Sequence, residues 1–141
     1  MWNEVETFEK EFALKNNSKY AIWVANWLDA LKISLLALWI GKWDEVITTS
    51  HSAVATTLAI LDVWATPIFV DIDEYYHINT EKIVQKVTRN TKAILPVHLY
   101  GQLAAMPEIM IIAEKYGLLV LEDSAQSHGA AINGKKAGNW G

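Results

Sequence analysis

Residues 117–130 read Gly-Leu-Leu-Val-Leu-Glu-Asp-Ser-Ala-Gln-Ser-His-Gly-Ala, and this stretch decides the predicted fold. The apolar run 118–121 is typical of a buried strand, and it ends on two acidic residues, Glu122 and Asp123. Just before it, residues 107–116 have helical apolar spacing, and the glycine that follows stands where helices commonly end. A helix followed at once by a buried strand predicts a parallel sheet with crossover helices.

The same alternation of helices and strands continues upstream, with short connections. Helices are expected at residues 6–14, 28–38, 53–63, 80–87 and 107–116, and strands at 20–25, 45–48, 67–72, 92–99 and 118–121, with an Asn-Gly hairpin over 131–136. This pattern predicts an α/β fold of three layers, with a mostly parallel sheet between helices. Asn26 and Thr80 are the expected N-caps of the helices that follow them.

Composition limits the classes to which the chain can belong. It has 141 residues, of which 52% are hydrophobic, with a formal net charge of −4 and no cysteine. This length supports one domain with a core of its own. The mild acidity and the absence of any apolar run near the roughly 18 residues that span a bilayer predict neither a nucleic-acid nor a membrane partner. Without cysteine, disulfides and thiolate chemistry are excluded.

Polar residues follow three of the predicted strands, in segments 48–52, 98–102 and 122–129. In open α/β sheets, ligands bind outside the carboxyl ends of the strands, so these segments are candidate site residues. A fourth candidate is the helix start at 26–29, because free N–H groups at a helix start can hold a phosphate.

Each candidate also has a simpler structural interpretation. Ser50 and Ser52 are suitable caps for the next helix, and local sequence favours that role. His98 fits an interior histidine with satisfied hydrogen bonds, and Asp123 fits an N-cap or a salt-bridge partner as well as a functional carboxylate. The sequence contains no glycine-rich phosphate motif and no His/Asp/Glu set with metal-ligand spacing.

Seven stretches, taken together, are much more specific than any single motif. They are residues 5–12, 25–31, 44–47, 50–56, 65–73, 96–102 and 122–130. In order and spacing the chain resembles the DegT-type (DegT/DnrJ/StrS) sugar-nucleotide aminotransferases, a branch of the fold-type-I pyridoxal-phosphate (PLP) enzymes in the aspartate aminotransferase superfamily. The resemblance covers nearly the whole chain, and it implies the large PLP-binding domain of that fold, present in part.

The resemblance implies a role for five positions. Asp123 resembles the carboxylate that pairs with the pyridine nitrogen of PLP and keeps it protonated, so that the ring can take up carbanion electrons. Gln126 resembles the amide that contacts the phenolic oxygen of the cofactor. Trp27 and Leu28 stand at the pair whose backbone N–H groups hold the phosphate. Ala53 stands where the family usually carries an aromatic residue against the ring.

The resemblance also implies a function for the intact protein. It would transfer an amino group from glutamate to a nucleotide-linked keto-sugar for surface polysaccharide or a glycosylated metabolite, as a cytoplasmic homodimer. We expect the Schiff-base lysine and the C-terminal small domain beyond residue 141, and a further helix before residue 5. Because transamination needs that lysine to bind the cofactor and to move a proton, residues 1–141 are expected to be inactive alone.

Two alternatives to this function stay open. One is a PLP-dependent sugar dehydratase on the same scaffold, in which histidine replaces the lysine. The other is a non-catalytic fragment or regulatory module. The residue at the downstream lysine position distinguishes the aminotransferase from the dehydratase.

Tryptophan is unusually abundant, because the chain has 7 tryptophans and 7 glycines, whereas tryptophan is normally much rarer than glycine. We hypothesise that the codons of six of these tryptophans, named at the end of this paragraph, are UGA. They would be read as tryptophan by the translation table used but as glycine in the source organism. The alternative is that these tryptophans are genuine and pack in the core, and UGG codons at the six sites would support it. The six stand where the resembling family has glycine: Trp2, Trp23, Trp27, Trp39, Trp43 and Trp64.

Overall fold

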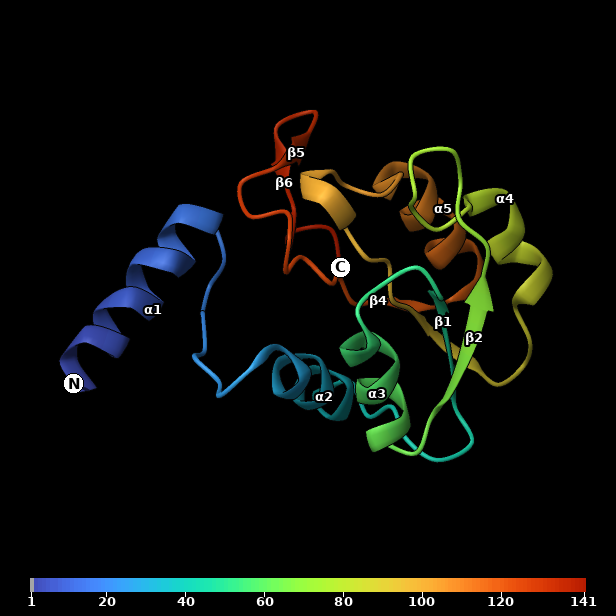
Figure 1. Cartoon of the computed structure of the whole chain (residues 1–141), viewed down its shortest axis with the longest axis horizontal. Coiled ribbons are helices and arrows are strands. Elements are labelled where there is room, and N and C mark those ends of the chain that lie inside the picture. The colour runs from blue at the N-terminus through green and yellow to red at the C-terminus, as the bar shows by residue number, and fades with distance from the viewer. Residues whose placement is uncertain (1) are drawn as a thin grey trace.

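A four-stranded parallel sheet with helices on both faces forms the body of the computed structural model, which describes residues 2–141 (Figure 1). The strand order is β2-β1-β3-β4, and a separate two-stranded antiparallel sheet pairs β5 with β6. The helices are α1 (Trp2–Asn16), α2 (Trp27–Ala37), α3 (Val54–Asp62), α4 (Thr80–Ile83) and α5 (Met106–Tyr116), with 3₁₀ turns η1 (Val84–Lys86) and η2 (Leu99–Gly101). The strands are β1 (Glu45–Thr49), β2 (Thr66–Val70), β3 (Thr91–Ile94), β4 (Leu119–Val120), β5 (Ala131–Ile132) and β6 (Lys135–Lys136).

Two apolar clusters, one on each face of the sheet, make up the core. Successive residues of a strand point to opposite faces, so Val46 of β1 joins the cluster with α2 and α3, whereas Ile47 joins the cluster with α4 and α5. The expected three-layer α/β arrangement with a mostly parallel sheet is therefore confirmed. Within residues 2–141, no helix combines the length and apolar character needed to cross a membrane.

Helix α1 lies to one side of these layers and is joined to them by residues 17–26 (Figure 1). Its C-terminal end is held by the far end of the chain, because the side chain of Asn139 donates to the carbonyl oxygen of Asn16 at 2.7 Å and Lys136 donates to that of Lys15. The segment 20–25 is therefore not the strand predicted for it. It is irregular, and the backbone N–H of Trp23 finds the Glu9 carboxylate of α1 at 2.6 Å instead of a neighbouring strand.

Several predicted features also differ from the structure. The strand predicted over 118–121 is expected to be buried, but β4 lies at the edge of the sheet, spans only Leu119–Val120, and leaves Leu119 42% exposed. The strand expected over 92–99 ends at Ile94, because Pro96 has no N–H to continue a ladder; a single bridge from Val97 to Asp123 resumes the pairing. The helix expected over 80–87 is a short α4 followed by η1, and its cap is Asn79 rather than Thr80. The Asn26 cap is confirmed, since its side chain accepts from Asp29 N at 2.9 Å.

The predicted hairpin is also confirmed. β5 and β6 pair antiparallel, and the two turn residues Asn133 and Gly134 have φ of 52° and 81°. Two positive φ values in succession are characteristic of the type I′ turn that Asn-Gly favours.

Four helices end in the same left-handed turn. After α1 the turn residue is Asn17 (φ 54°), and Ser18 N donates to Ala13 O at 2.9 Å; the other three turns follow α5, α2 and α3. The turn residue is Gly117 after α5 (φ 64°), Trp39 after α2 (φ 59°) and Trp64 after α3 (φ 64°). In each turn, the next backbone N–H donates to the carbonyl oxygen five residues earlier, at 2.8, 3.0 and 3.2 Å for α5, α2 and α3. This helix ending usually places glycine at the left-handed residue, because a β-carbon there crowds the backbone.

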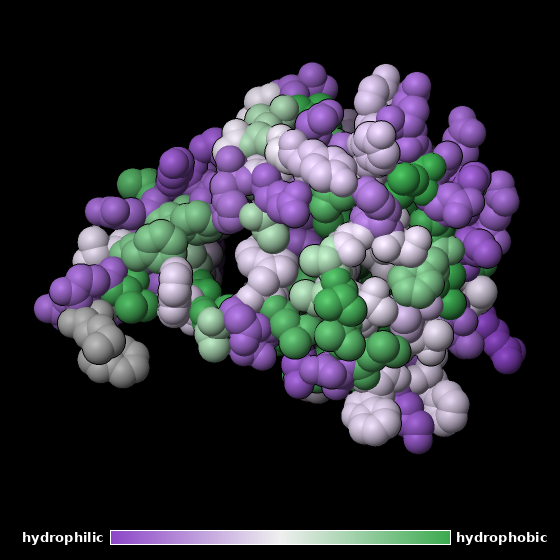
Figure 2. All heavy atoms as spheres, in the orientation of Figure 1, coloured by the Kyte–Doolittle hydropathy of each residue, from purple (hydrophilic) through white to green (hydrophobic). Residues whose placement is uncertain are grey.

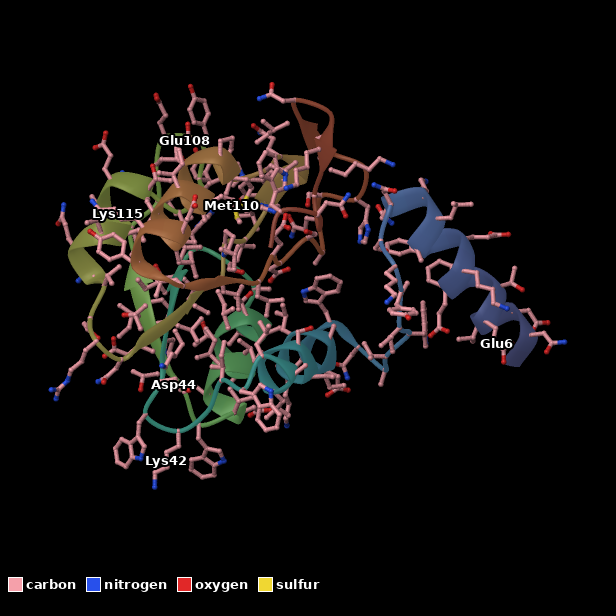
Figure 3. The ribbon with its side chains drawn as sticks, turned by 180° about the vertical axis from the view of Figure 1, so that it is seen from behind. Glu6, Lys42, Asp44, Glu108, Met110 and Lys115 are labelled. Atoms are coloured by element: carbon pink, nitrogen blue, oxygen red, sulfur yellow. The ribbon has the colours of Figure 1, made fainter. Side chains whose placement is uncertain are left out.

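A third tryptophan occupies a tight turn between α2 and β1. Asp44 N donates to Gly41 O at 3.1 Å, which makes Trp43, with φ 78°, the third residue of a turn that prefers glycine there. Its neighbour Lys42 points away from the body of the molecule (Figure 3). Trp39, Trp43 and Trp64 are 92%, 76% and 78% exposed, so the interpretation that they pack in the core is wrong.

Replacing each of these three tryptophans by glycine is expected to stabilise the fold. Trp39→Gly, Trp43→Gly and Trp64→Gly each relieve left-handed strain and remove little buried surface, so we expect the free energy of unfolding to rise by about 1 kcal/mol per site. Urea titration followed by circular dichroism measures this. Trp140→Gly is the control, because Trp140 packs on the second apolar cluster and its loss should cost about 2 kcal/mol or more. Equal destabilisation by all four changes would contradict the strain argument.

Candidate functional site

Asp123 lies at the carboxyl edge of the sheet, immediately beyond β4. Its backbone N–H donates to Pro96 O at 2.9 Å, and its carbonyl oxygen accepts from His98 N at 3.0 Å. Its side chain is buried, with only 4% of the residue exposed. Backbone pairing to the strand end of β3 therefore sets the position of this carboxylate.

Three donors from three parts of the chain converge on the Asp123 carboxylate. Thr56 of α3 donates its hydroxyl to Oδ2 at 2.8 Å, and the Trp27 indole Nε1–H at the start of α2 donates to Oδ1 at 2.8 Å. The backbone N–H of Ala125 also approaches Oδ1, at 3.3 Å. Asp123 caps no helix and has no cationic partner in residues 2–141, so its interpretation as an N-cap or a salt-bridge partner is wrong.

Thr56 is a site residue that the sequence reasoning did not single out. It is fully buried, and its hydroxyl is also within 2.8 Å of the Ser52 hydroxyl. A signal was present in the sequence, because Thr56 lies three and four residues before Ala59 and Ile60 and so falls on the buried face of a helix. A polar residue on such a face needs a partner, and Asp123 is that partner.

The predicted capping role of Ser50 and Ser52 is wrong. The N-cap of α3 is Ala53, which makes no side-chain capping bond, while Ser52 turns instead to Thr56. Ala53 itself is exposed, one helical turn before Thr56.

The start of α2 brings two free backbone donors close to Asp123. Asn26 caps the helix, and the backbone N–H groups of Trp27 and Leu28 have no hydrogen-bond partner within residues 2–141. The Trp27 ring lies edge-on to His128, with centroids 6.5 Å apart and planes at 80°. The helix start and the segment after β4 therefore meet through the indole ring.

Gln126 links the segment 122–129, to which it belongs, to the segment 98–102. Its side-chain Oε1 accepts the backbone N–H of Tyr100 at 3.0 Å, and the Tyr100 hydroxyl lies 3.1 Å from His51 Nε2. Tyr100 and Tyr76 both have positive φ, at 57° and 67°, and their rings pack edge to face with centroids 5.8 Å apart. The structure thus brings together the segments after β1, β3 and β4, as predicted for this edge of the sheet.

His98 and Glu122 form a buried pair beside Asp123. His98 is fully buried; its Nδ1 accepts from Ala104 N at 3.2 Å, and its Nε2 lies 2.9 Å from Glu122 Oε2. The backbone N–H leaves Nδ1 as the acceptor and Nε2 as the donor, so the interpretation of His98 as a satisfied interior histidine is confirmed.

Glu122 fastens the C-terminal segment to the end of β4. Its carboxylate accepts backbone N–H groups from Gly138, Trp140 and Gly141 at 2.9, 2.6 and 3.0 Å. Burial alone would raise the pKa of the Glu122 carboxyl, but the hydrogen bonds from His98 and these backbone groups outweigh burial and hold its pKa below the usual value.

A cavity of about 640 Å³ adjoins these residues. It lies between α1, the segment 18–27 and the C-terminal segment, and Figure 2 shows the surface hollowed between α1 and the body. Trp27 and His128 line it, and so do Phe8 and Phe12 of α1. The residues beside Asp123 therefore border a hollow whose wall includes aromatic side chains from α1 and from the start of α2.

The chain is similar in sequence to known proteins along its whole length. Residues 1–141 match the family described as the DegT/DnrJ/EryC1/StrS aminotransferase family. The chain belongs to this family. Over 139 residues it is 50% identical to the dTDP-3-amino-3,6-dideoxy-alpha-D-galactopyranose transaminase of Aneurinibacillus thermoaerophilus, with 98% of the chain and 38% of that protein covered. The chain thus spans well under half the length of this curated relative.

Two solved structures share the fold of this chain. NtdA from Bacillus subtilis, with bound cofactor PMP (pyridoxamine phosphate), superposes with a TM-score of 0.90 at 41% identity, covering 94% of this chain and 31% of that one. A GDP-4-keto-6-deoxymannose-3-dehydratase with a trapped PLP-glutamate geminal diamine superposes with a TM-score of 0.89 at 34% identity, covering 95% and 36%. A PMP-bound protein and a dehydratase therefore share this portion of the fold.

Removing the Glu122 carboxylate should lower the free energy of unfolding at neutral pH. It should also make that free energy less dependent on pH under acidic conditions. Because the folded pKa is lowered, the stabilisation by Glu122 is fully present above its unfolded pKa, about 4.3, and is lost as pH falls through the lower folded value. Glu122→Gln should therefore cost about 1–3 kcal/mol at pH 7 and show a smaller loss of stability below pH about 4.3. Urea unfolding at a series of pH values measures both effects.

The matched control for this change is Glu74→Gln, which removes an exposed carboxylate. It should leave the free energy of unfolding at pH 7, and its decrease at acidic pH, close to those of the unaltered chain. If Glu122→Gln lost stability with falling pH as steeply as the unaltered chain, the lowered pKa of Glu122 would be contradicted.

Proposed function

We propose that this chain is part of a PLP-dependent aminotransferase that moves an amino group from glutamate to a keto-sugar carried on a nucleotide. The observation that carries the proposal is the buried Asp123 carboxylate at the carboxyl edge of the sheet, held by Thr56 and facing an aromatic N–H donor. Membership of the aminotransferase family supports the reaction class, and the transaminase relative supports a nucleotide-linked sugar as substrate.

The donor and acceptor chemistry around Asp123 fits the pyridine ring of PLP. One carboxylate oxygen is occupied by Thr56, while the other accepts a flat heteroaromatic N–H, that of the Trp27 indole, which is the donor type that a protonated pyridine nitrogen presents. When bound, PLP supplies an electron sink for the carbon that gains or loses the amino group. Asp123 would stabilise the protonated ring nitrogen by its negative charge, and Thr56 would keep the carboxylate oriented.

The remaining predicted residues have suitable chemistry for the other parts of the cofactor. The free N–H groups of residues 27 and 28, at the positive end of the α2 dipole, would hold the phosphate. Gln126 uses Oε1 to accept from Tyr100, which leaves its amide N–H groups to donate to the phenolic oxygen. Ala53, exposed at the start of α3, would lie against the ring without the stacking that an aromatic residue provides.

Residues 1–141 would form part of the cofactor-binding large domain. The lysine that carries the cofactor would lie outside these residues, since within 2–141 no lysine forms a hydrogen bond or ion pair with Asp123, Thr56 or Gln126. The intact protein would act as a cytoplasmic homodimer, and its aminated sugar would enter surface polysaccharide or a glycosylated metabolite.

A sugar dehydratase is the second candidate, because the dehydratase structure covers the same part of the fold. The two reactions differ in their products. An aminotransferase consumes glutamate and adds nitrogen to the sugar, whereas a dehydratase removes the elements of water from it. A non-catalytic fragment or regulatory module would do neither.

Changing Asp123 to asparagine in the intact protein should abolish most of its activity. Loss of one fixed charge that stabilises the reacting state commonly costs about 10²–10³-fold, so we expect a decrease in kcat/KM of that order. The assay supplies PLP, glutamate and nucleotide-linked keto-sugars, and measures 2-oxoglutarate together with the mass of the sugar product.

Asp62→Asn is the matched control, because Asp62 is an exposed carboxylate paired with Lys32 away from the site. It should retain full activity. A sugar product without added nitrogen would favour the dehydratase, and equal activity of the two variants would overturn the assignment of Asp123.

A further inference from the structure

We infer that Trp27 closes the cofactor site of this chain, because its indole N–H donates to Asp123 from the position that the ring nitrogen of the cofactor would occupy. Glycine at position 27 would open the site. This inference rests on the proposed function of Asp123. It concerns a contact between two residues 96 positions apart in the sequence, Nε1 to Oδ1 at 2.8 Å.

The Asp123 carboxylate has no room for a second aromatic donor while the indole is in place. Thr56 occupies Oδ2, and Oδ1 already accepts from both Trp27 and Ala125 N. With only 4% of Asp123 exposed, another ring nitrogen can reach the carboxylate only where the indole now lies. Binding of the indole and binding of the cofactor ring are therefore mutually exclusive.

The indole contributes to neither of the apolar clusters of the core. Trp27 is 38% exposed, it lines the cavity beside α1, and its ring contact is the edge-on approach to His128. Removing its side chain would therefore open space at the site without emptying the core. The cap of α2 would also remain, because it depends on Asn26 and Asp29.

The same substitution would free the other end of the site. The backbone N–H groups of residues 27 and 28 have no partner within the described chain, and they lie at the first turn of the eleven-residue α2. Glycine retains the backbone donor and lets a phosphate approach closely, whereas an indole attached at residue 27 crowds that approach. Position 27 thus controls both the ring and the phosphate ends of the proposed site.

The test measures binding of pyridoxamine phosphate (PMP) to the unaltered chain and to its Trp27→Gly variant by equilibrium dialysis. PMP has the ring, phenolic oxygen and phosphate of PLP but no aldehyde, so it cannot attach to surface lysines. We expect Trp27→Gly to bind PMP at least about tenfold more tightly, since a site that is mostly closed has its apparent affinity lowered by the open fraction. Trp64→Gly, the same change in an exposed turn, should bind PMP as the unaltered chain does.

A second measurement examines the contact itself without any ligand. In ¹⁵N-labelled protein, the indole N–H signal that is missing from Trp27→Gly identifies Trp27. Its hydrogen exchange should be at least about tenfold slower than that of the exposed Trp64 indole, because exchange requires opening of the hydrogen bond. Asp123→Asn should weaken that protection, and circular dichroism establishes that each variant is folded.

The possible outcomes separate this inference from the proposed function. Equal PMP binding by the unaltered chain and Trp27→Gly, or no binding by a folded Trp27→Gly, would overturn the inference, as would an unprotected Trp27 indole. If Trp27→Gly binds PMP and the added Asp123→Asn change abolishes that binding, both the inference and the role of Asp123 are supported. If Asp123→Asn leaves the gained binding intact, the proposed cofactor role of Asp123 fails, and with it the inference.

Discussion

The buried carboxylate of Asp123 is the constraint on which the site depends. A charge with 4% exposure is costly to bury unless donors surround it. Here the donors come from separate elements, the hydroxyl of Thr56 from α3 and the indole of Trp27 from α2. Satisfying one carboxylate therefore draws the starts of two helices to the end of β4. The position of the carboxylate itself is set by backbone pairing with Pro96 and His98, so the sheet topology determines the geometry of the site.

Regular alternation made the sheet and the edge that bears the site predictable from sequence. The apolar run before Glu122 and the helix before it were enough to place Asp123 at a carboxyl edge, because parallel strands end together. The segment 20–25 was wrongly predicted as a strand because its apolar composition suits one. A strand also needs a neighbouring strand, whereas this segment lies against α1. Likewise, Ser52 has the chemistry of a cap, but its hydroxyl has a nearer partner in Thr56. Such choices between partners depend on tertiary positions that local sequence does not contain.

Backbone geometry and residue identity disagree in the same direction at the ends of α2 and α3. α5 ends with glycine in a left-handed turn, and α2 and α3 end in the same turn with Trp39 and Trp64. The hydrogen bonds that define the turn persist in all three, so the helix and the following strand set the backbone irrespective of the side chain. The large exposed rings at residues 39 and 64 offer no packing in return for the strain. This pattern is what the hypothesis of glycine codons read as tryptophan predicts, and a core role for these rings does not explain it.

Position 27 involves a different constraint from the turns, which is why it needs a separate argument. Trp27 does not have positive φ, so its backbone alone does not demand glycine. The preference for glycine at residue 27 comes instead from the binding site. A carboxylate oxygen accepts any well-placed N–H, so Asp123 does not distinguish an indole from a protonated pyridine. An indole at residue 27 can therefore satisfy Asp123 without disturbing Thr56 or the sheet. The electrostatic features of a binding site can thus remain intact while a side chain of the same protein occupies the place of its ligand.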